Sequence, residues 1–159
     1  MTNGFWKGLV VCLAALALAA CGIKQSFADA ETEVQVFHQR YDAEQYSVIW
    51  REGEPRLRSK GDYKQFETFL AGIHKALGKL RSTKQVGWNA NQVSAGTLIV
   101  LTYESQFERG RAWEAFTFAP VGEKVKLVGY YITDTPPAGT SAAPAAPDPM
   151  GPARTEPTG

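Results

Sequence analysis

The chain has 159 residues, of which 44% are hydrophobic and 21% are charged, and its formal net charge at neutral pH is +1. This balance argues against nucleic-acid binding, because that function calls for a clustered basic face. The two cysteines, Cys12 and Cys21, both lie near the N-terminus, so the rest of the sequence offers neither a disulfide framework nor a thiolate metal site. Stability must therefore come from a hydrophobic core.

The N-terminus is predicted to be an export signal. Lys7 supplies a positive charge ahead of an apolar run from Leu9 to Ala19, which is the layout of a secretory signal. This run is too short for a transmembrane helix, which needs about 20 residues. Its ending, Leu18-Ala19-Ala20-Cys21, resembles the signals of bacterial lipoproteins, which are cleaved before a cysteine whose sulfur carries diacylglycerol.

The lipoprotein resemblance implies a covalent lipid on Cys21, and no other cofactor is expected. Two or more acyl chains anchor a protein stably, whereas a single chain gives only marginal binding. Gly22 stands where, in the lipoproteins that this chain resembles, an aspartate favours retention in the inner membrane. We therefore expect anchoring to the outer membrane, facing the periplasm. The alternative is an ordinary signal peptide in which Cys21 is incidental.

Composition divides the remaining chain into three parts. Residues 21–30 are expected to form a tether, and residues 31–134 to form one domain of ordinary size that contains most of the aromatic residues. Residues 135–159 are rich in Pro, Ala and Gly and lack aromatic residues, so they are expected to be disordered. A Pro-rich spacer or a ligand for a partner is the alternative function of this tail.

Apolar residues at helical spacing predict the first half of the domain to be helical. Val34, Phe37 and Tyr41 predict a helix over residues 31–41. A second short helix, or a continuation of the first, is predicted around residues 46–50 and is expected to end at the Gly-Glu-Pro sequence of residues 53–55. The basic residues that follow are interpreted as a solvated loop between helices, or alternatively as a binding site for acidic headgroups: Arg51, Arg56, Arg58 and Lys60.

The strongest periodicity in the chain predicts the principal helix. Its apolar residues are spaced by three and four positions: Tyr63, Phe66, Leu70, Ile73, Leu77 and Leu80. Asp62 precedes the first of them, with Gln65 three residues later, which is the arrangement of a capping box. Lys79 and Arg81 suit the negative end of the helix dipole.

After Arg81 the hydrophobic period changes to two, which predicts strands around residues 84–88, 97–107, 113–118 and 125–132. Short connections imply that neighbouring strands are antiparallel. Helices followed by a four-stranded meander predict an α+β fold in which the helices cover one face of a curved sheet, like a cone. The alternative is a flat sheet packed solidly on the helix, with no cavity.

Several short motifs, in this order, resemble those of a group of uncharacterised bacterial lipoproteins. They are Phe37…Tyr41-Asp-Ala-Glu-Gln-Tyr46, Leu77-Gly78-Lys79, Val86-Gly87-Trp88, Thr102-Tyr103 with Phe107-Glu-Arg-Gly110, Glu114-x-Phe116 and Leu127-Val-Gly129-Tyr130. The group belongs to the nuclear-transport-factor-2-like, cystatin-like class of α+β cones. The resemblance covers nearly all of residues 31–133 and implies a fold and a compartment, but no reaction and no catalytic residue.

The residues that could carry chemistry are few. His38 has one carboxylate at helical spacing, Asp42, and His74 has none, so neither has the set of ligands that a metal site needs, and each is interpreted as a hydrogen-bonded boundary residue. Glu114 shares a strand face with Phe116 and Phe118. It is interpreted as exposed or paired with a neighbouring arginine, Arg109 or Arg111. The alternative is a pocket carboxylate with Tyr103 or Tyr46 as hydrogen-bond donor, as in the steroid isomerases to which this architecture is similar.

The sequence therefore favours a lipid-anchored periplasmic module that binds an envelope protein or a small apolar ligand without catalysis. The residues expected to line its aromatic pocket are Tyr46, Trp50, Trp88, Tyr103 and Trp113. A cofactor-free isomerase or hydrolase that uses Glu114 or His74 is the first alternative. A structural envelope lipoprotein that acts through its tail is the second. No metal site is expected.

Overall fold

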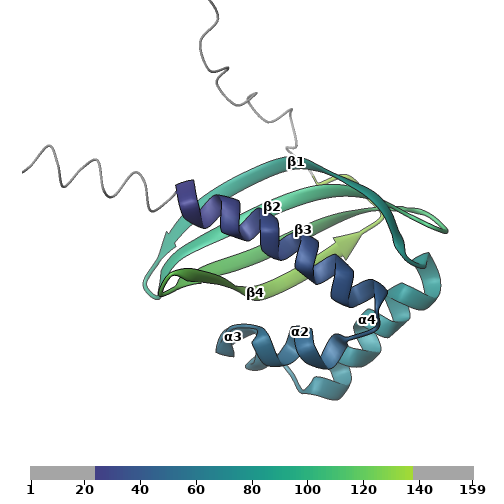
Figure 1. Cartoon of the computed structure of the whole chain (residues 1–159), viewed down its shortest axis with the longest axis horizontal. Coiled ribbons are helices and arrows are strands. Elements are labelled where there is room, and N and C mark those ends of the chain that lie inside the picture. Colours follow the sequence, from purple (N-terminus) through teal and green to yellow (C-terminus); the bar gives the residue numbers. More distant parts are fainter. Residues whose placement is uncertain (1–23, 138–159) are drawn as a thin grey trace, which may run out of the picture.

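The structure, a computed structural model, describes residues 24–137. An N-terminal helix over residues 24–42 is followed by α2 (Tyr46–Glu52), α3 (Pro55–Arg58) and α4 (Tyr63–Leu77). Four strands then complete the domain: β1 (Leu80–Val93), β2 (Gly96–Phe107), β3 (Arg111–Val121) and β4 (Lys124–Thr133). Figure 1 shows the N-terminal helix lying across the sheet, with α2 and α3 beside it. The predicted signal peptide, Cys21 and the chain beyond residue 137 lie outside the described residues.

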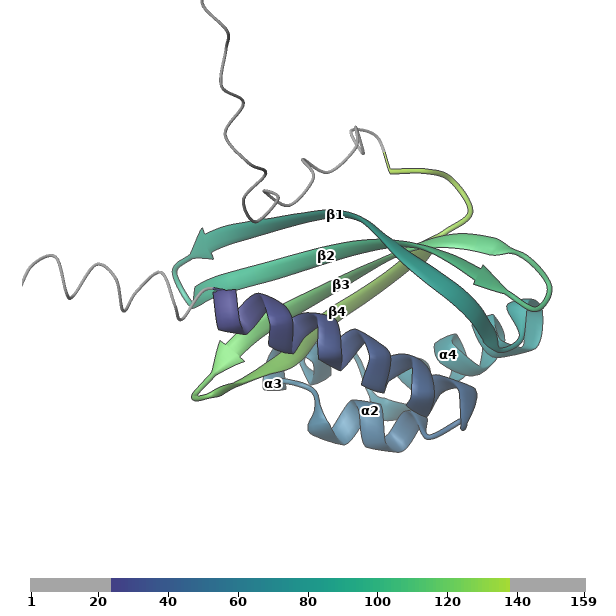
Figure 2. The same cartoon turned by 45° about the horizontal axis from the view of Figure 1, so that its top comes forward.

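The four strands form one antiparallel sheet in the order β1-β2-β3-β4, as the short connections predicted. The pairing of β1 with β2 shifts between Leu80 and Ser82 and again between Gln85 and Gly87, and that of β3 with β4 shifts between Thr117 and Phe118. Such bulges increase the local twist. The sheet arches over the helices, which lie on its concave side (Figure 2). The predicted α+β class, with helices on a curved four-stranded sheet, is confirmed.

The helices end where local chemistry requires. The carboxylate of Asp62 accepts a hydrogen bond from the backbone N–H of Gln65 (2.9 Å), so the predicted N-cap of α4 is confirmed. The helix stops at Leu77, because Gly78 adopts a φ of +78° that favours glycine. The prediction that Leu80 continues the helical stripe is therefore wrong; Leu80 is the first residue of β1.

Arg109, rather than the predicted Lys79 and Arg81, binds the C-terminal end of α4. Its guanidinium donates to the carbonyl oxygens of His74 (2.8 Å), Lys75 (2.7 Å) and Ala76 (3.0 Å). The carbonyls of Lys75 and Ala76 have no partner within the helix, whereas that of His74 also accepts the N–H of Gly78 (2.8 Å). The β2–β3 turn that carries Arg109 is thereby fixed to the C-terminus of α4.

Two segments are more ordered than the sequence suggested. Residues 24–30, expected as a tether, belong to the N-terminal helix, where Ala30 is fully buried and the ring of Phe27 lies 4.8 Å from that of Trp88. The prediction of a loop around Arg56 and Arg58 is partly wrong, because Pro55 begins the short helix α3. Proline is favoured at a first helical position, and the Glu54 carboxylate accepts the Arg56 N–H (2.7 Å).

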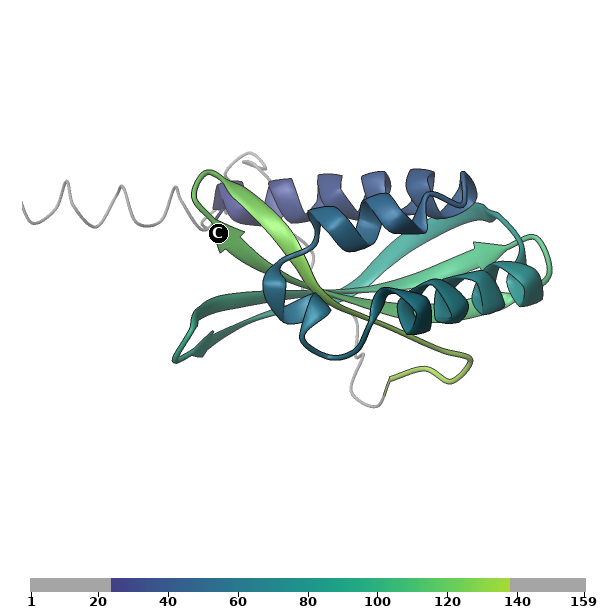
Figure 3. The same ribbon diagram turned by 90° about the horizontal axis from the view of Figure 1, so that it is seen from below.

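The core fills the space between the helices and the concave face of the sheet. The N-terminal helix lies on one side of this space and α4 on the other, as Figure 3 shows from below. The buried face of β2 carries Ile99, Leu101, Tyr103 and Phe107, as the alternating pattern predicted. Within residues 24–137, no helix is long and apolar enough to cross a membrane.

Candidate ligand-binding site

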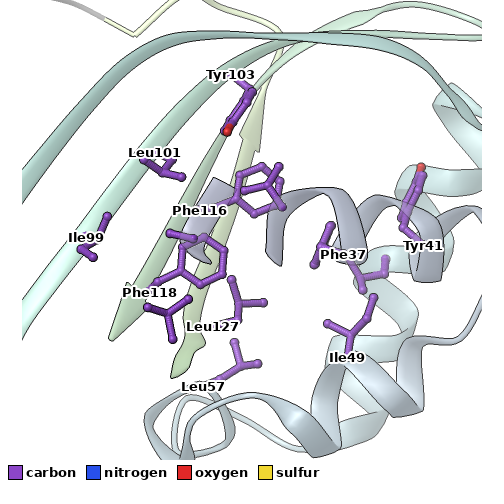
Figure 4. Packing of buried hydrophobic residues seen from close by; sticks show 14 of the residues in the cluster. Phe37, Tyr41, Ile49, Leu57, Ile99, Leu101, Tyr103, Phe116, Phe118 and Leu127 are labelled. Atoms are coloured by element: carbon purple, nitrogen blue, oxygen red, sulfur yellow. The ribbon is translucent and has the colours of Figure 1, made fainter. Parts of the chain in front are cut away.

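A cavity of about 340 Å³ opens between the N-terminal helix, α2 and the β3–β4 hairpin. We call it the hairpin cavity. Its buried apolar lining comes from all three elements: Phe37, Ile49, Phe118, Val125 and Leu127. In Figure 4, Phe37 and Ile49 on the helices face Phe118 and Leu127 on the strands across the core. The volume lies within the range of about 300–1,000 Å³ that is usual for ligand pockets.

Charged side chains of both signs surround this apolar lining. Glu33 and Arg40 come from the N-terminal helix, Glu52 from α2, and Lys124 and Lys126 from β4. Arg40 and Glu52 form an ion pair (Nη2–Oε2, 2.7 Å) that joins the two helices at the cavity wall. Burial raises the pKa of the half-buried Glu33 carboxyl, and the positive charges of Arg40 and Lys124 oppose that shift only in part.

Close packing around Gly53, the residue after α2, fixes one wall of the hairpin cavity. A Cβ atom on Gly53 would lie 2.5 Å from Cδ2 of Leu57 and 3.4 Å from the carbonyl oxygen of Leu127. The next residue, Glu54, donates its N–H to that same Leu127 oxygen (2.9 Å). The α2–α3 junction is therefore pressed against β4, which positions both sides of the hairpin cavity.

A buried polar cluster is formed by Glu114 on β3, Tyr130 on β4 and His38 on the N-terminal helix. None of these three residues lines the hairpin cavity. Glu114, only 1% exposed, accepts a hydrogen bond from the Tyr130 hydroxyl (2.6 Å), and its other oxygen lies 2.9 Å from His38 Nε2. Because a carboxylate can only accept, Nε2 donates and Nδ1 is left with no partner among the described residues. Burial, and then the negative charge of Glu114, raise the pKa of Tyr130 well above its usual value of 10.0.

This cluster corrects the main interpretation of Glu114. The carboxylate is neither exposed nor paired with an arginine, since Arg109 binds the end of α4 and Arg111 pairs with Glu104 (3.0 Å). The donors in the structure are Tyr130 and His38, in place of the expected Tyr103 or Tyr46. The interpretation of His38 as a hydrogen-bonded residue is confirmed, although the side chain is buried and its partner is 76 positions away in sequence.

The five aromatic residues expected to line a pocket are dispersed over the domain. Tyr46 packs near Tyr41, and its buried hydroxyl has no partner in the described chain; burial raises its pKa to about 12. Trp50 lies against Phe66 and lines a smaller cavity of about 180 Å³ together with Tyr130.

The other three expected residues belong to the sheet. Trp88 is 55% exposed and contacts Phe27 at the start of the N-terminal helix. Tyr103 is buried on the concave face and donates to Gln85 Oε1 (3.2 Å), while burial raises its pKa to about 12. Trp113 alternates with the buried Ala112 and Glu114, so it points away from the helices, where the Arg111 guanidinium lies 4.9 Å from its ring.

His74, the other histidine considered for catalysis, is half-buried on α4 and packs on the ring of Tyr41 (5.1 Å). Its Nδ1 lies 3.9 Å from Glu44, and its buried Nε2 has no partner within residues 24–137. In the same part of the chain, no three His, Cys, Asp or Glu side chains are close enough together to hold a metal ion. None of the residues that line the hairpin cavity was singled out as a site from the sequence.

The fold and the hairpin cavity define a single α+β domain with an amphipathic pocket between its helices and its last hairpin. The chain belongs to the family described as a protein of unknown function (DUF4019), whose model matches residues 33–130. This match begins within the N-terminal helix and ends within β4. No curated protein sequence matches the chain.

Proposed function

We propose that this protein is a lipid-anchored binding module of the bacterial cell envelope, facing the periplasm, and that it acts without catalysis. The hairpin cavity is the observation that carries the proposal. Five buried apolar side chains and five charged ones from three separate elements meet around one opening. Small-molecule sites combine an apolar lining with placed polar groups, and the hairpin cavity contains both.

The anchor is supported by sequence and by the position of the first helix. The Leu-Ala-Ala-Cys ending of the export signal supplies the thiol, and the order of motifs in the domain resembles that of bacterial lipoproteins. Only Gly22 and Ile23 stand between Cys21 and residue 24, from which the structure describes helix. A lipid on Cys21 would therefore hold the domain close to the bilayer, with Gly22 favouring the outer membrane.

Metabolic labelling tests the anchor. We expect labelled palmitate to be incorporated into the full chain and the protein to be recovered with outer-membrane vesicles. The Cys21→Ser variant should lose the label and the membrane association. Recovery of the unsubstituted protein in the soluble periplasmic fraction, with an unmodified N-terminus, would refute the anchor.

Analysis of bound compounds tests the binding role. The full chain, extracted in detergent and purified, is denatured, and the compounds released are compared with those released from empty micelles. We expect one class of compound to be enriched in proportion to the protein. Release of nothing beyond the micelle blank would count against a binding module.

A cofactor-free isomerase or hydrolase is the second candidate, and the buried Glu114 favours it. An isomerase of this kind uses a carboxylate kept in an apolar site as its base, and Glu114 is such a buried carboxylate. Its two oxygens already accept from Tyr130 and His38, so a donor to the substrate would have to come from elsewhere. Its route to a substrate would pass through Tyr130, which lines the cavity of about 180 Å³. If the protein is such an enzyme, the Glu114→Gln variant should still bind a compound released from the purified protein but should no longer convert it.

A further inference from the structure

The charges around the hairpin cavity differ in whether they already have partners. Arg40 and Glu52 neutralise each other across the helix–helix contact. Glu33, Lys124 and Lys126 make no hydrogen bond or ion pair with any part of the chain that the structure describes. Glu33 lies on the same helical face as Phe37 and Arg40, one and two turns away, so its carboxylate stands next to the apolar lining.

The unpartnered charges come from opposite walls. Glu33 belongs to the N-terminal helix, and the two lysines belong to β4, where they alternate with the buried Val125 and Leu127. Lys124 lies near enough to Glu33 for its charge to lower the pKa of that carboxyl, yet farther than an ion-pair distance of 4.0 Å. Because they alternate with Val125 and Leu127, Lys124 and Lys126 leave β4 on the opposite face, and their ammonium groups reach the cavity opening around the edge of this outermost strand. Glu33 stands at the same opening on the helix wall.

We propose that the hairpin cavity binds a small zwitterion that carries an apolar group, with its ammonium on Glu33 and its anionic group on Lys124 and Lys126. This inference rests on the proposed binding function and names the ligand class of that site. The apolar group would contact Phe37, Phe118 and their neighbours. Two sources share this chemistry: a short apolar peptide with free termini, and the head and upper chain of an aminophospholipid.

Other ligand classes fit the charges less well. A wholly apolar ligand would bury Glu33 further and leave it without a partner, which is costly for a carboxylate. Glu33 would repel a purely anionic ligand, and the two lysines would repel a purely cationic one. The cavity of about 340 Å³ also lies at the small end of the usual range, which suits a dipeptide or a lipid head better than a larger ligand.

Calorimetry with the full chain in detergent, blanked against empty micelles, tests the proposal. The probes are leucyl-leucine, its N-acetyl form, its C-terminal amide, and lysophosphatidylethanolamine. We expect leucyl-leucine or the lysolipid to bind, and each blocked peptide to bind about tenfold more weakly or worse than the free one, as loss of a charge-assisted hydrogen bond predicts. Which of the two unblocked probes binds identifies the source.

Variants assign the two ends of the ligand. Glu33→Gln should weaken the free peptide or lysolipid about tenfold and leave the N-acetyl peptide unaffected, because that peptide has no ammonium. Lys124→Gln should weaken the free ligand but not the C-terminal amide. Glu123→Gln and Lys75→Gln, at exposed positions outside the cavity, are the matched controls. All four changes are at half-buried or exposed positions, and unchanged melting temperatures verify the fold.

Three results would overturn the inference. The first is failure of both unblocked probes to bind. The second is equal binding of free and blocked peptides. The third is equal affinity for Glu33→Gln and Glu123→Gln. Release of a different class of compound from the purified protein, together with any of these, leaves the binding function standing and rejects only the zwitterion; release of nothing rejects both.

Discussion

Replacing Tyr130 by Phe removes one hydroxyl from the buried cluster and little else. The ring contacts with Phe37, Phe69 and Phe116 remain, while Glu114 loses its 2.6 Å hydrogen bond. Because Glu114 is only 1% exposed, bulk water does not supply a replacement donor. Hydrogen bonds to charged groups contribute about 1.5–3 kcal/mol, so we expect the free energy of unfolding to fall by about 2 kcal/mol. For a domain of about 100 residues this lowers Tm by roughly 8 °C.

Tyr46→Phe is the matched control. It removes a buried tyrosine hydroxyl that has no partner in the described chain, so we expect the free energy of unfolding to change by less than about 0.5 kcal/mol, or to rise. Urea unfolding followed by tryptophan fluorescence measures both variants. Equal losses for Tyr130→Phe and Tyr46→Phe would show that the hydrogen bond to Glu114 does not stabilise the fold. A double-mutant cycle with Glu114→Gln would then show no coupling between Tyr130 and Glu114.

Three further predictions concern stability. Gly78→Ala should destabilise the domain by more than about 1 kcal/mol in urea unfolding, because φ is +78° and the new Cβ would meet Glu108, whereas Gly72→Ala, in open space on α4, should stabilise it by about 0.5–1 kcal/mol. Arg109→Ala should cost about 1–2 kcal/mol through the lost carbonyl contacts, and Arg81→Ala, which breaks an exposed pair, less than about 0.5 kcal/mol; equal thermal shifts would contradict this. The raised pKa of Tyr130 means that the folded protein keeps a proton that the unfolded chain releases, so thermal stability should decline above pH 10.0, and less steeply for Tyr130→Phe.

The affinity of the hairpin cavity for a zwitterion should also depend on pH. Protonation of Glu33 removes the partner of the ligand's ammonium, and burial places this pKa above its usual 4.5. The charges that act on Glu33 are those of Arg40, Glu52, Lys124 and Asp29. Affinity should therefore fall as the pH is lowered toward that value, and Glu33→Gln should flatten the profile. A wild-type profile as flat as that of the variant would contradict the role of Glu33.

The order of elements could be predicted from the sequence because each element shows its own period. The stripe from Tyr63 to Leu77 and the alternation around Leu101 are local signals, and both were confirmed. The errors fell at boundaries. Leu80 keeps the helical spacing, but the positive φ of Gly78 ends the helix before it. Conversely, Phe27 and Ala30 continue the spacing of Val34 backward, a signal that would have extended the first helix.

The candidate site was less accessible to sequence reasoning, because its residues are brought together only by the tertiary structure. Glu114 was recognised from its strand face, but nothing local indicates that His38, 76 positions earlier, lies next to it. Tyr130 could have been suggested, since the strand pairing places it opposite Phe116, near Glu114. The charges of the hairpin cavity look like ordinary surface residues in the sequence. They become candidates for ligand binding only because the fold places them around a common apolar lining.

Native mass spectrometry of the full chain, extracted intact from the bacterial envelope, tests both the anchor and the bound ligand in one experiment. We expect an acylated polypeptide that carries one additional small ligand. That ligand should be lost from a Glu33→Gln/Lys124→Gln double variant and kept by Glu123→Gln. A spectrum that shows only the bare polypeptide in every case, or a ligand whose occupancy ignores the cavity substitutions, would contradict it.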